Sequence, residues 1–417
     1  MRSGDQAVAS RPSVVVAQLA ATGAPPSAVI GVRNALQRRS GGSTVPVGSA
    51  FLGTVLAVIA LCGTAVFGAS LSHLTATPRL YGDPFQLSFN PNGGPSDPTL
   101  LPRLEHDSAI TGITKGAGGG ELSINKVITW TLAASPVRGR PLFSTVDGHL
   151  PNGAGQIALG ATTMRLVGAH LGSVVHVTIS KGALKRTVPF RVVSQVSLPV
   201  LAAGSVGLGT GALITIPGLE HLFCPPNPGQ LACRQRLENQ GDGGILASVA
   251  SDPRGQAAIS HYLDSYSSIA TLPITPTSLV NFGETVNFPL IFGAMLAVFG
   301  VATLLHLLVV SVTRRRREIG LLKVLGFVNG QVASTVAWQA TTLALVGIVL
   351  GVPIGLVVGQ AVWRAFANNL GVVPAPVVPI WLIVVLVAGV LTVANVIAIA
   401  PALAATRSKP GELLRTS

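Results

Sequence analysis

The sequence predicts a helical membrane protein in which one transmembrane helix precedes, and three follow, a large α+β domain outside the cytoplasm. Of the 417 residues, 48% are hydrophobic and 10% carry a charge, whereas soluble domains average about 25% charged residues. Four apolar stretches carry no formal charge over the roughly 20 residues that a helix needs to span a bilayer. The segment between the first two stretches holds charges of both signs, glycines, prolines and short β-branched runs, which are typical of a mixed fold.

These features predict the order of segments along the chain. Runs such as Leu122–Ala133 and the alternating Val174–Ile179 predict strands in the central domain. A short amphipathic helix is expected over Ser27–Arg39, on the cytoplasmic side of the first span. The expected segments are a cytoplasmic N-terminal segment (1–44), transmembrane helices (45–72, 287–313, 335–362 and 379–403), an extracytoplasmic α+β domain (73–286), a short cytoplasmic helix (314–327), an external loop (363–378) and a cytoplasmic tail (404–417).

The distribution of basic residues predicts the orientation in the membrane. Between Arg79 and Glu284 the chain holds 14 basic and 12 acidic residues, and the rest holds 14 basic and 3 acidic ones. Basic residues concentrate in cytoplasmic loops, so the groups around Arg38, Arg314–Arg317 and Arg407 predict a multi-pass plasma-membrane protein with both termini inside. No nucleic-acid partner is expected, because the excess charge lies beside the spans and not among aromatic side chains on a soluble face.

Three cysteines limit the redox chemistry that the chain can perform. Cys62 lies in an apolar span, where we expect inert packing. Cys224 and Cys233 flank a Pro/Gly-rich loop in the central domain, and a disulfide is the expected state if that domain is extracytoplasmic. Two free thiols are the alternative. No metal site is expected, because two thiols and the nearby His221 do not complete a tetrahedral set.

The segment that follows the four consecutive arginines has the pattern of a surface helix. Its apolar residues cover one broad face of a helical wheel, and Arg316, Gly320 and Lys323 share the other. Such a helix lies flat in the membrane interface or docks in a groove of a partner protein. Gly320 lacks a side chain and would let a partner backbone approach closely. The apolar residues are Ile319, Leu321, Leu322, Val324 and Leu325.

The third span carries a glycine at every fourth position. This spacing places the glycines along one helix face, where two membrane helices can pack backbone to backbone. We expect close packing within the chain or across a dimer, with a ligand groove as the alternative. Pro353 permits a kink in the same helix. The glycines are Gly347, Gly351, Gly355 and Gly359.

Enzyme signatures are missing from the sequence. There is no GxxxxGK[ST] phosphate loop, no HExxH and no GxSxG, so we expect neither catalytic residues nor a bound cofactor. The polar residues within the spans are His306, Gln360 and Asn395, for which hydrogen bonding between helices is the expected role. No intramembrane carboxylate accompanies His306 in a proton relay.

Two motifs resemble the FtsX-like (MacB-type) ABC-transporter permeases. One is RRRREIGLLKVLGF, and the other is the closing PALAATRSKPGELLR, where Pro401, Ala405, Pro410, Leu414 and Arg415 fit the family pattern. The order of spans is also similar to that family, especially to the C-terminal half of long actinobacterial permeases. Residues of the first motif that match the family are Arg317, Glu318, Ile319, Gly320, Leu321, Leu322, Lys323, Leu325 and Gly326.

The resemblance implies a role and a set of partners. The short helix 314–327 would be the coupling helix, seated on a separate cytoplasmic ABC ATPase that binds the ATP. A second permease subunit or copy would complete a dimer in the bilayer. The first two spans would transmit motion to the outer domain for export or extraction of lipid, lipoprotein or peptide. The chain departs from the family at Gln339, where many relatives have glutamate, and after Gly330, where the usual basic residues are missing.

Three other interpretations remain open at the level of sequence. The chain could be a mechanotransmission scaffold that regulates a cell-wall hydrolase without moving a substrate. It could be an incomplete half-permease from a split gene, which the irregular opening segment suggests. An enzyme acting in the outer domain is the third, and it would require activity of that domain on a lipid or peptidoglycan.

Overall fold

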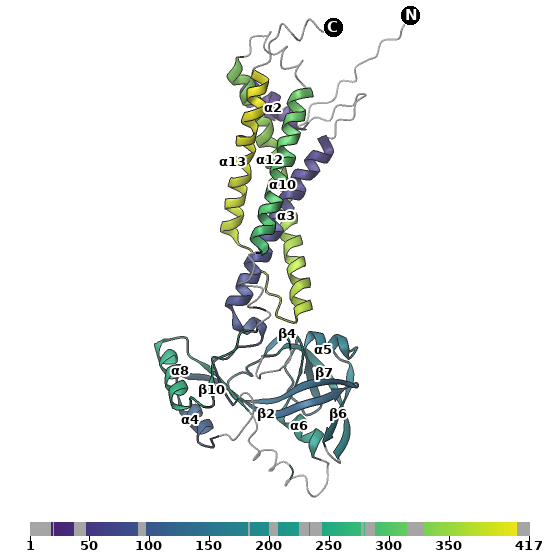
Figure 1. The fold of residues 1–417 in the computed structure, drawn as a ribbon, viewed down its shortest axis with the longest axis vertical. Helices are drawn as coiled ribbons and strands as arrows, with labels where there is room; N and C mark the ends of the chain where they lie inside the picture. Colours follow the sequence, from purple (N-terminus) through teal and green to yellow (C-terminus); the bar gives the residue numbers. More distant parts are fainter. Residues whose placement is uncertain are drawn as a thin grey trace, which may run out of the picture. The chain divides into compact units, whose positions relative to one another are not determined.

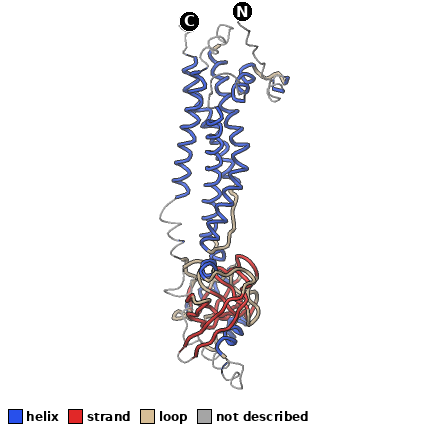
Figure 2. The backbone as a smooth tube through the Cα atoms, turned by 90° about the vertical axis from the view of Figure 1, so that its right-hand side faces the viewer, coloured by secondary structure: helices blue, strands red, loops and turns tan. Residues whose placement is uncertain are grey.

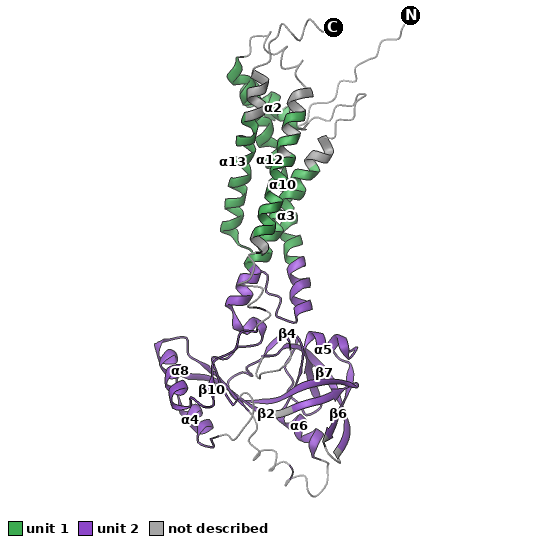
Figure 3. Ribbon diagram, viewed as in Figure 1, with its two compact units in different colours: residues 1–69, 288–361, 377–417 green, residues 70–287, 362–376 purple. Residues whose placement is uncertain are grey.

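The computed structural model describes most of the chain, which falls into two compact units (Figures 1–3). We call residues 1–69, 288–361 and 377–417 the helical unit and residues 70–287 and 362–376 the sheet domain. The described residues are 18–19, 21–36, 47–90, 97–181, 184–199, 207–224, 233, 244–276, 279, 288–314 and 328–406.

Long apolar helices build the helical unit. The helices are α2 (Pro26–Leu36), α3 (Val47–Ala76), α10 (Phe288–Arg314), α12 (Asn329–Leu370) and α13 (Ile380–Thr406). Of these, α3, α12 and α13 are long and apolar enough to cross a membrane, over Leu52–Ala76, Asn329–Leu370 and Ile380–Ile399, and α10 has a shorter apolar stretch, Ile291–Thr303. Large apolar side chains such as Val357 and Val384 are more than 60% exposed, which suits contact with lipid. The chain is therefore a membrane protein.

Helix α12 extends further than the sequence predicts. We expect an external loop over 363–378, but α12 continues to Leu370 and the loop begins at Gly371, which is left-handed with φ 78°. The prediction is wrong because Arg364 limits the apolar stretch without ending the helix. No glycine or proline interrupts the chain between Gly359 and Gly371, so nothing local stops the helix earlier.

The four glycines of α12 all lie against α3. A Cβ atom at Gly355 would come within 2.7 Å of Cys62 Cβ, and one at Gly351 within 2.7 Å of Val58 Cβ. Gly347 lies against Thr54, and Gly359 against Gly63 and Val66. Each step of four residues on α12 thus matches a step of four on α3, in the same chain direction. The two helices run parallel and are in backbone-to-backbone contact.

The other helices pack around this pair. Val336, Ala340 and Ala344 on α12 form a buried cluster with Ala394 and Ala398 on α13. Helix α10 packs along α13. Alanine supplies more than half of the buried residues of the α12–α13 cluster, and small residues are common where helices associate in lipid.

Apart from the ends of α3 and α12, the described residues of the sheet domain form ten strands and five short helices. The strands are β1 (Leu87–Phe89), β2 (Ile110–Ile124), β3 (Val127–Arg138), β4 (Ser144–Gly148), β5 (Gln156–Leu159), β6 (Val174–Lys181), β7 (Leu184–Ser197), β8 (Ala212–Ile214), β9 (Ile245–Val249) and β10 (Ala270–Thr271). The helices are η1 (Pro78–Tyr81), α4 (Leu100–His106), α5 (Ala161–Leu166), α6 (Ile216–Phe223) and α8 (Pro253–Ser265).

Six of the strands close into a small barrel. The pairs β2–β3, β8–β5, β7–β6 and β6–β2 are antiparallel, and β3–β8 and β5–β7 are parallel. Its core includes Ile124, Ile157, Val177, Phe190 and Ile214, all at most 1% exposed. The sheet continues from β2 through β9 and β1 to β10, where α4 and α8 cover a second core. Closure removes strand edges that would otherwise pair with other chains.

A tight turn joins β2 to β3 in the middle of a predicted strand. The run 122–133 reads as one strand, but Asn125 and Lys126 both have positive φ, 46° and 73°. This is the signature of a two-residue hairpin of type I′. The Asn125 backbone N–H donates to the carbonyl oxygen of His176 (3.0 Å), and its side-chain oxygen accepts from the His176 N–H (2.9 Å). The turn therefore helps to close the barrel.

Cys224 and Cys233 form a disulfide in the structure. Their Cα atoms are 5.8 Å apart, which lies in the usual range. Cys224 directly follows α6, whose N-terminus is capped by the Thr215 hydroxyl accepting from the Gly218 N–H (3.1 Å). The bond therefore fixes the chain where it leaves a packed helix.

Asp83 is a buried carboxyl group just beyond η1. It is 3% exposed, and its Oδ2 atom has no hydrogen-bond partner among the described residues. Burial raises the pKa of Asp83 to about 7. Burial also raises the pKa of the Tyr81 phenol, and the charge of Asp83 adds to that rise. Asp83 is thus neutral in the folded protein over a pH range where it would ionise in an unfolded chain.

A larger residue in the α3–α12 contact should destabilise the helical unit. For Gly355→Ala, we expect a loss of about 1–3 kcal/mol, because the added methyl group overpacks the contact. The control is Gly389→Ala on α13, where no atom lies within 4 Å of an added Cβ and helix propensity favours alanine. Thermal unfolding of the purified chain in mild detergent measures both. Equal midpoints for the two variants would contradict the backbone contact.

The buried carboxyl of Asp83 predicts a stability that falls as pH rises. The unfolded chain releases this proton near pH 4 and the folded protein near pH 7. The folded state therefore loses up to about 4 kcal/mol between these values. Asp83→Asn should remove most of that loss, whereas Asp264→Asn, at an exposed carboxylate, should keep it. The measurement is the unfolding midpoint between pH 4.5 and 8, and parallel curves for Asp83→Asn and the unmodified chain would refute the assignment.

Candidate functional site

The predicted ATPase-contact residues lie outside the described part of the chain. Helix α10 ends at Arg314 and α12 begins at Asn329, so the structure describes only the two ends of the connection. The residues concerned are Arg317, Glu318, Ile319, Gly320, Leu321, Leu322, Lys323, Leu325 and Gly326. Their contact with a partner stays a prediction from the sequence.

The start of α12 is capped and braced beside this connection. The Gln331 side chain accepts from the Val328 backbone N–H (3.1 Å), which resembles half of a capping box. Helix α2 packs on the next turns, because a Cβ at Gly31 would lie 2.7 Å from the carbonyl oxygen of Thr335 and from Trp338 Cβ. Gln339, the position that departs from the family, is buried. The chain thus uses Gln331 as a helix cap where the resemblance suggests basic residues.

The polar residues of the helices have different surroundings. The Thr341 hydroxyl donates to Asn395 Oδ1 (3.1 Å), and the Asn395 side chain donates to the carbonyl oxygen of Leu391 (2.9 Å). This network joins α12 to α13. His306 on α10 is exposed. The described residues hold no cluster of three or more His, Cys, Asp or Glu that could bind a metal.

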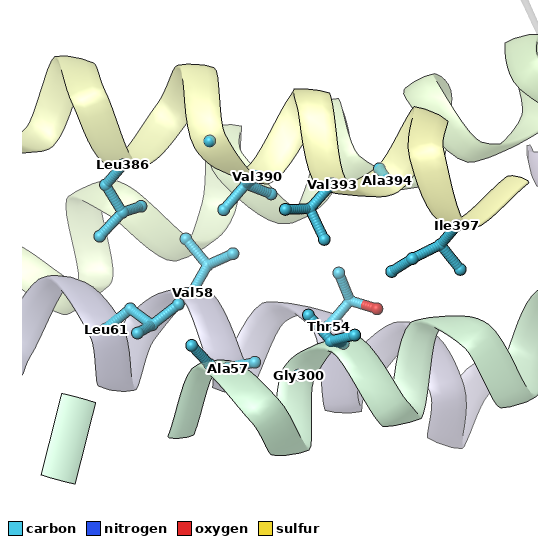
Figure 4. A pocket seen from close by; sticks show the side chains of 13 residues that line it. Thr54, Ala57, Val58, Leu61, Gly300, Leu386, Val390, Val393, Ala394 and Ile397 are labelled. Carbon is cyan, nitrogen blue, oxygen red and sulfur yellow. The ribbon is translucent and has the colours of Figure 1, made fainter. Parts of the chain in front are cut away.

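An apolar cavity of about 260 Å³ lies between α3, α10 and α13 (Figure 4). Its walls offer one side-chain hydroxyl, that of Thr54, among aliphatic groups. Figure 4 shows Val58 and Leu61 on α3 facing Leu386 and Val390 on α13. A cavity with this lining can accept hydrocarbon and gives a polar group almost no hydrogen-bond partners.

The C-terminal end of α12 belongs to the sheet domain and meets Arg165 at the end of α5. Arg165 Nη2 donates to the carbonyl oxygen of Asn369 (3.2 Å), and Nη1 donates to that of Asn368 (3.5 Å). Nη2 also donates to the Thr162 hydroxyl (3.2 Å). The last carbonyl groups of a helix lack partners within the helix and carry partial negative charge. Arg165 therefore caps α12 from another element.

Two further contacts hold the same helix end. A Cβ added at Gly371 would clash with Gly209 Cα, and both glycines are left-handed. The Val373 N–H donates to the carbonyl oxygen of Leu80 in η1 (2.9 Å). The Gly209 carbonyl accepts from the Thr162 N–H (2.7 Å), which ties the loop to α5. We name the group formed by Arg165, Gly209, Leu80 and residues 368–373 the α12 junction.

A half-polar cavity of about 440 Å³ opens beside the α12 junction. Arg165, Asp147, Gln195 and Asn368 supply its polar groups. Sequence reasoning missed this region, because it placed residues 363–378 in a loop. The available signal was the absence of a helix breaker before Gly371, together with the Asn-Asn-Leu-Gly ending.

Comparison with known proteins identifies the C-terminal third of the chain. Residues 290–410 match the FtsX-like permease C-terminal domain, and this range contains most of α10 and the whole of α12 and α13. No curated protein matches the chain. The resemblance given by the two sequence motifs is confirmed, because residues 290–410 of this membrane protein match the FtsX-like permease C-terminal domain.

Proposed function

We propose that the chain is the permease subunit of an ABC transporter of the FtsX/MacB type. The observation that carries this proposal is the family match over residues 290–410. FtsX-like permeases generally work with a cytoplasmic ATPase, and the sequence has no GxxxxGK[ST] loop with which to bind ATP itself. The ATP would therefore be bound and hydrolysed by a partner subunit, and this chain would be neither an enzyme nor a cofactor protein.

In this proposal, the segment 314–327 receives the movement of the ATPase. Its apolar face seats in the partner, and Gly320 allows close approach of the two backbones. The bracing of the α12 start by α2 through Gly31 supports this, because a stiff helix start passes displacement on instead of absorbing it. The cap that Gln331 provides also stiffens the first turn of α12.

The proposed topology follows the charge distribution. Both termini and segment 314–327 lie in the cytoplasm, and four spans, α3, α10, α12 and α13, cross the plasma membrane. If four spans alternate in direction, the first (α3) and the third (α12) cross the membrane in the same direction. The parallel contact of α3 with α12 supports this arrangement. The sheet domain lies outside, where its Cys224–Cys233 disulfide is chemically stable. A second permease subunit or copy completes the dimer.

Export or extraction of a lipid, lipoprotein or peptide is the proposed task. The apolar cavity between α3, α10 and α13 supports an apolar ligand or lipid beside the spans. The second candidate is a mechanotransmission scaffold that regulates a cell-wall hydrolase. The reach of α3 and α12 into the sheet domain favours it, because that arrangement can relay motion without a transport path.

Affinity purification from native membranes tests the permease proposal. The tagged chain, extracted in mild detergent, should retain an ABC ATPase in near-stoichiometric amount, and mass spectrometry identifies it. A soluble hydrolase bound as well would favour the scaffold. Recovery of the folded chain without any ATPase would refute the proposal.

Substitutions in segment 314–327 should uncouple the complex and leave the chain folded. Glu318→Lys reverses a charge at the proposed contact, and Gly320→Trp blocks the backbone approach. We expect each to reduce retention of the ATPase at least tenfold. Glu121→Lys and Gly155→Trp are the matched controls, because both positions are exposed in the sheet domain and an added Cβ at Gly155 meets nothing within 4 Å. Unchanged retention in both test variants would show that the segment is not the contact.

A further inference from the structure

Two membrane helices continue into the sheet domain. Helix α3 runs from Val47 to Ala76 and α12 from Asn329 to Leu370, and the sheet domain begins at residue 70 on the first and at residue 362 on the second. Each passes from one unit to the other without an interruption of the helix. The last residues of α12, 368–370, belong to the α12 junction.

We propose that the α12 junction, formed by Arg165, Gly209, Leu80 and residues 368–373, carries the movement of α12 into the sheet domain. The inference rests on the proposed function and adds to it the residues through which movement would pass. The family resemblance implies that the first two spans transmit motion to the sheet domain. The α12 junction implies that the third span, α12, transmits part of that motion as well.

Arg165 supplies the electrostatic part of the junction. Its guanidinium group binds the carbonyl oxygens of Asn368 and Asn369, which end α12 and carry the negative end of the helix dipole. Hydrogen bonds from a charged donor are stronger than neutral ones. The same group binds the Thr162 hydroxyl on α5, and α5 directly follows strand β5 of the barrel. A pull on the end of α12 is thus a pull on the barrel.

Gly209 and Gly371 supply the steric part. An added Cβ at Gly209 would lie 2.9 Å from the carbonyl oxygen of Leu370 and 3.0 Å from Gly371 Cα. Two backbones in such contact cannot move toward each other, so the pair transmits a push where Arg165 transmits a pull. The Gly209 carbonyl is in turn bonded to the Thr162 N–H (2.7 Å), so both forces arrive at the start of α5.

The bond from the Val373 N–H to the Leu80 carbonyl brings in α3. Leu80 lies in η1, four residues beyond the end of α3 at Ala76. Within the helical unit, α3 and α12 already contact each other through the glycines. The two helices are therefore joined in the helical unit and, through their continuations, in the sheet domain.

Amide hydrogen exchange in the full-length chain, in lipid nanodiscs, tests the junction directly. The reporter is the peptide 367–376, which contains the Val373 amide, and strand β6 reports global folding. The test variants are Arg165→Gln and Gly209→Ala. Arg254→Gln controls for loss of an arginine, since Arg254 pairs with Asp252 on the surface (2.9 Å). Gly168→Ala controls for left-handed strain and Gly207→Ala for the loop, because an added Cβ at either meets nothing within 4 Å.

The expected result separates the test variants from the controls. Exchange in peptide 367–376 should rise at least tenfold in Arg165→Gln and Gly209→Ala and stay within twofold in the three controls, with β6 unchanged in all. Exchange within twofold of the unmodified chain in both test variants would overturn the proposal. If one test variant fails to fold, the other still decides the question.

A nucleotide comparison tests transmission. The complex purified from native membranes is exchanged with Mg-ATP and with Mg-ADP, and a nucleotide-dependent change in the sheet domain should vanish in both test variants and persist in the controls. A change that persists in the test variants overturns the proposal even where peptide 367–376 has loosened. A complex that holds an ATPase but shows no nucleotide effect in any form overturns the transmission route and leaves the permease assignment standing. Absence of an ATPase overturns both.

Discussion

Backbone contact between α3 and α12 is the interaction on which the rest of the structure depends. In lipid, apolar side chains gain little by leaving their solvent, so helices associate through close van der Waals packing. Four glycines of α12 bring it within contact of Thr54, Val58, Cys62 and Gly63 on α3. Helices α13 and α2 add to this pair through an alanine-rich cluster, and a hydrogen bond joins Thr341 on α12 to Asn395 on α13. The direction of α12 within the helical unit follows from that contact.

Local patterns predicted much of the fold because they act over a few residues. Apolar length predicted the long helices, four-residue glycine spacing predicted a packing face, and the two motifs predicted the family of residues 290–410. The partner of the glycine face was beyond sequence reasoning, because spacing describes one surface and does not say which helix meets it. The same limit applies to Arg165, whose partners on α12 lie about two hundred positions away in the chain.

Two differences between prediction and structure have a common physical cause. The β-branched run 122–133 predicts a strand, although Asn125 and Lys126 turn the chain back within it. The charge of Arg364 predicts the start of a loop, although the helix continues to Leu370. In both cases the composition of a segment indicates the environment that its side chains prefer. The conformation of the backbone depends on other properties, namely the φ values that each residue can adopt and the absence of glycine or proline. The end of an apolar stretch and the end of a helix are different properties.

The sheet domain is assembled from two separate parts of the chain, and this has a consequence for synthesis. Residues 70–287 leave the ribosome first, and 362–376 follow only after α10 and most of α12. Domains generally fold as units while the chain grows, so the barrel can close early, but Arg165 and Gly209 must wait for their partners. The finished domain therefore exists only when α10 and α12 have been inserted. Completion of its fold reports that these two helices are in place.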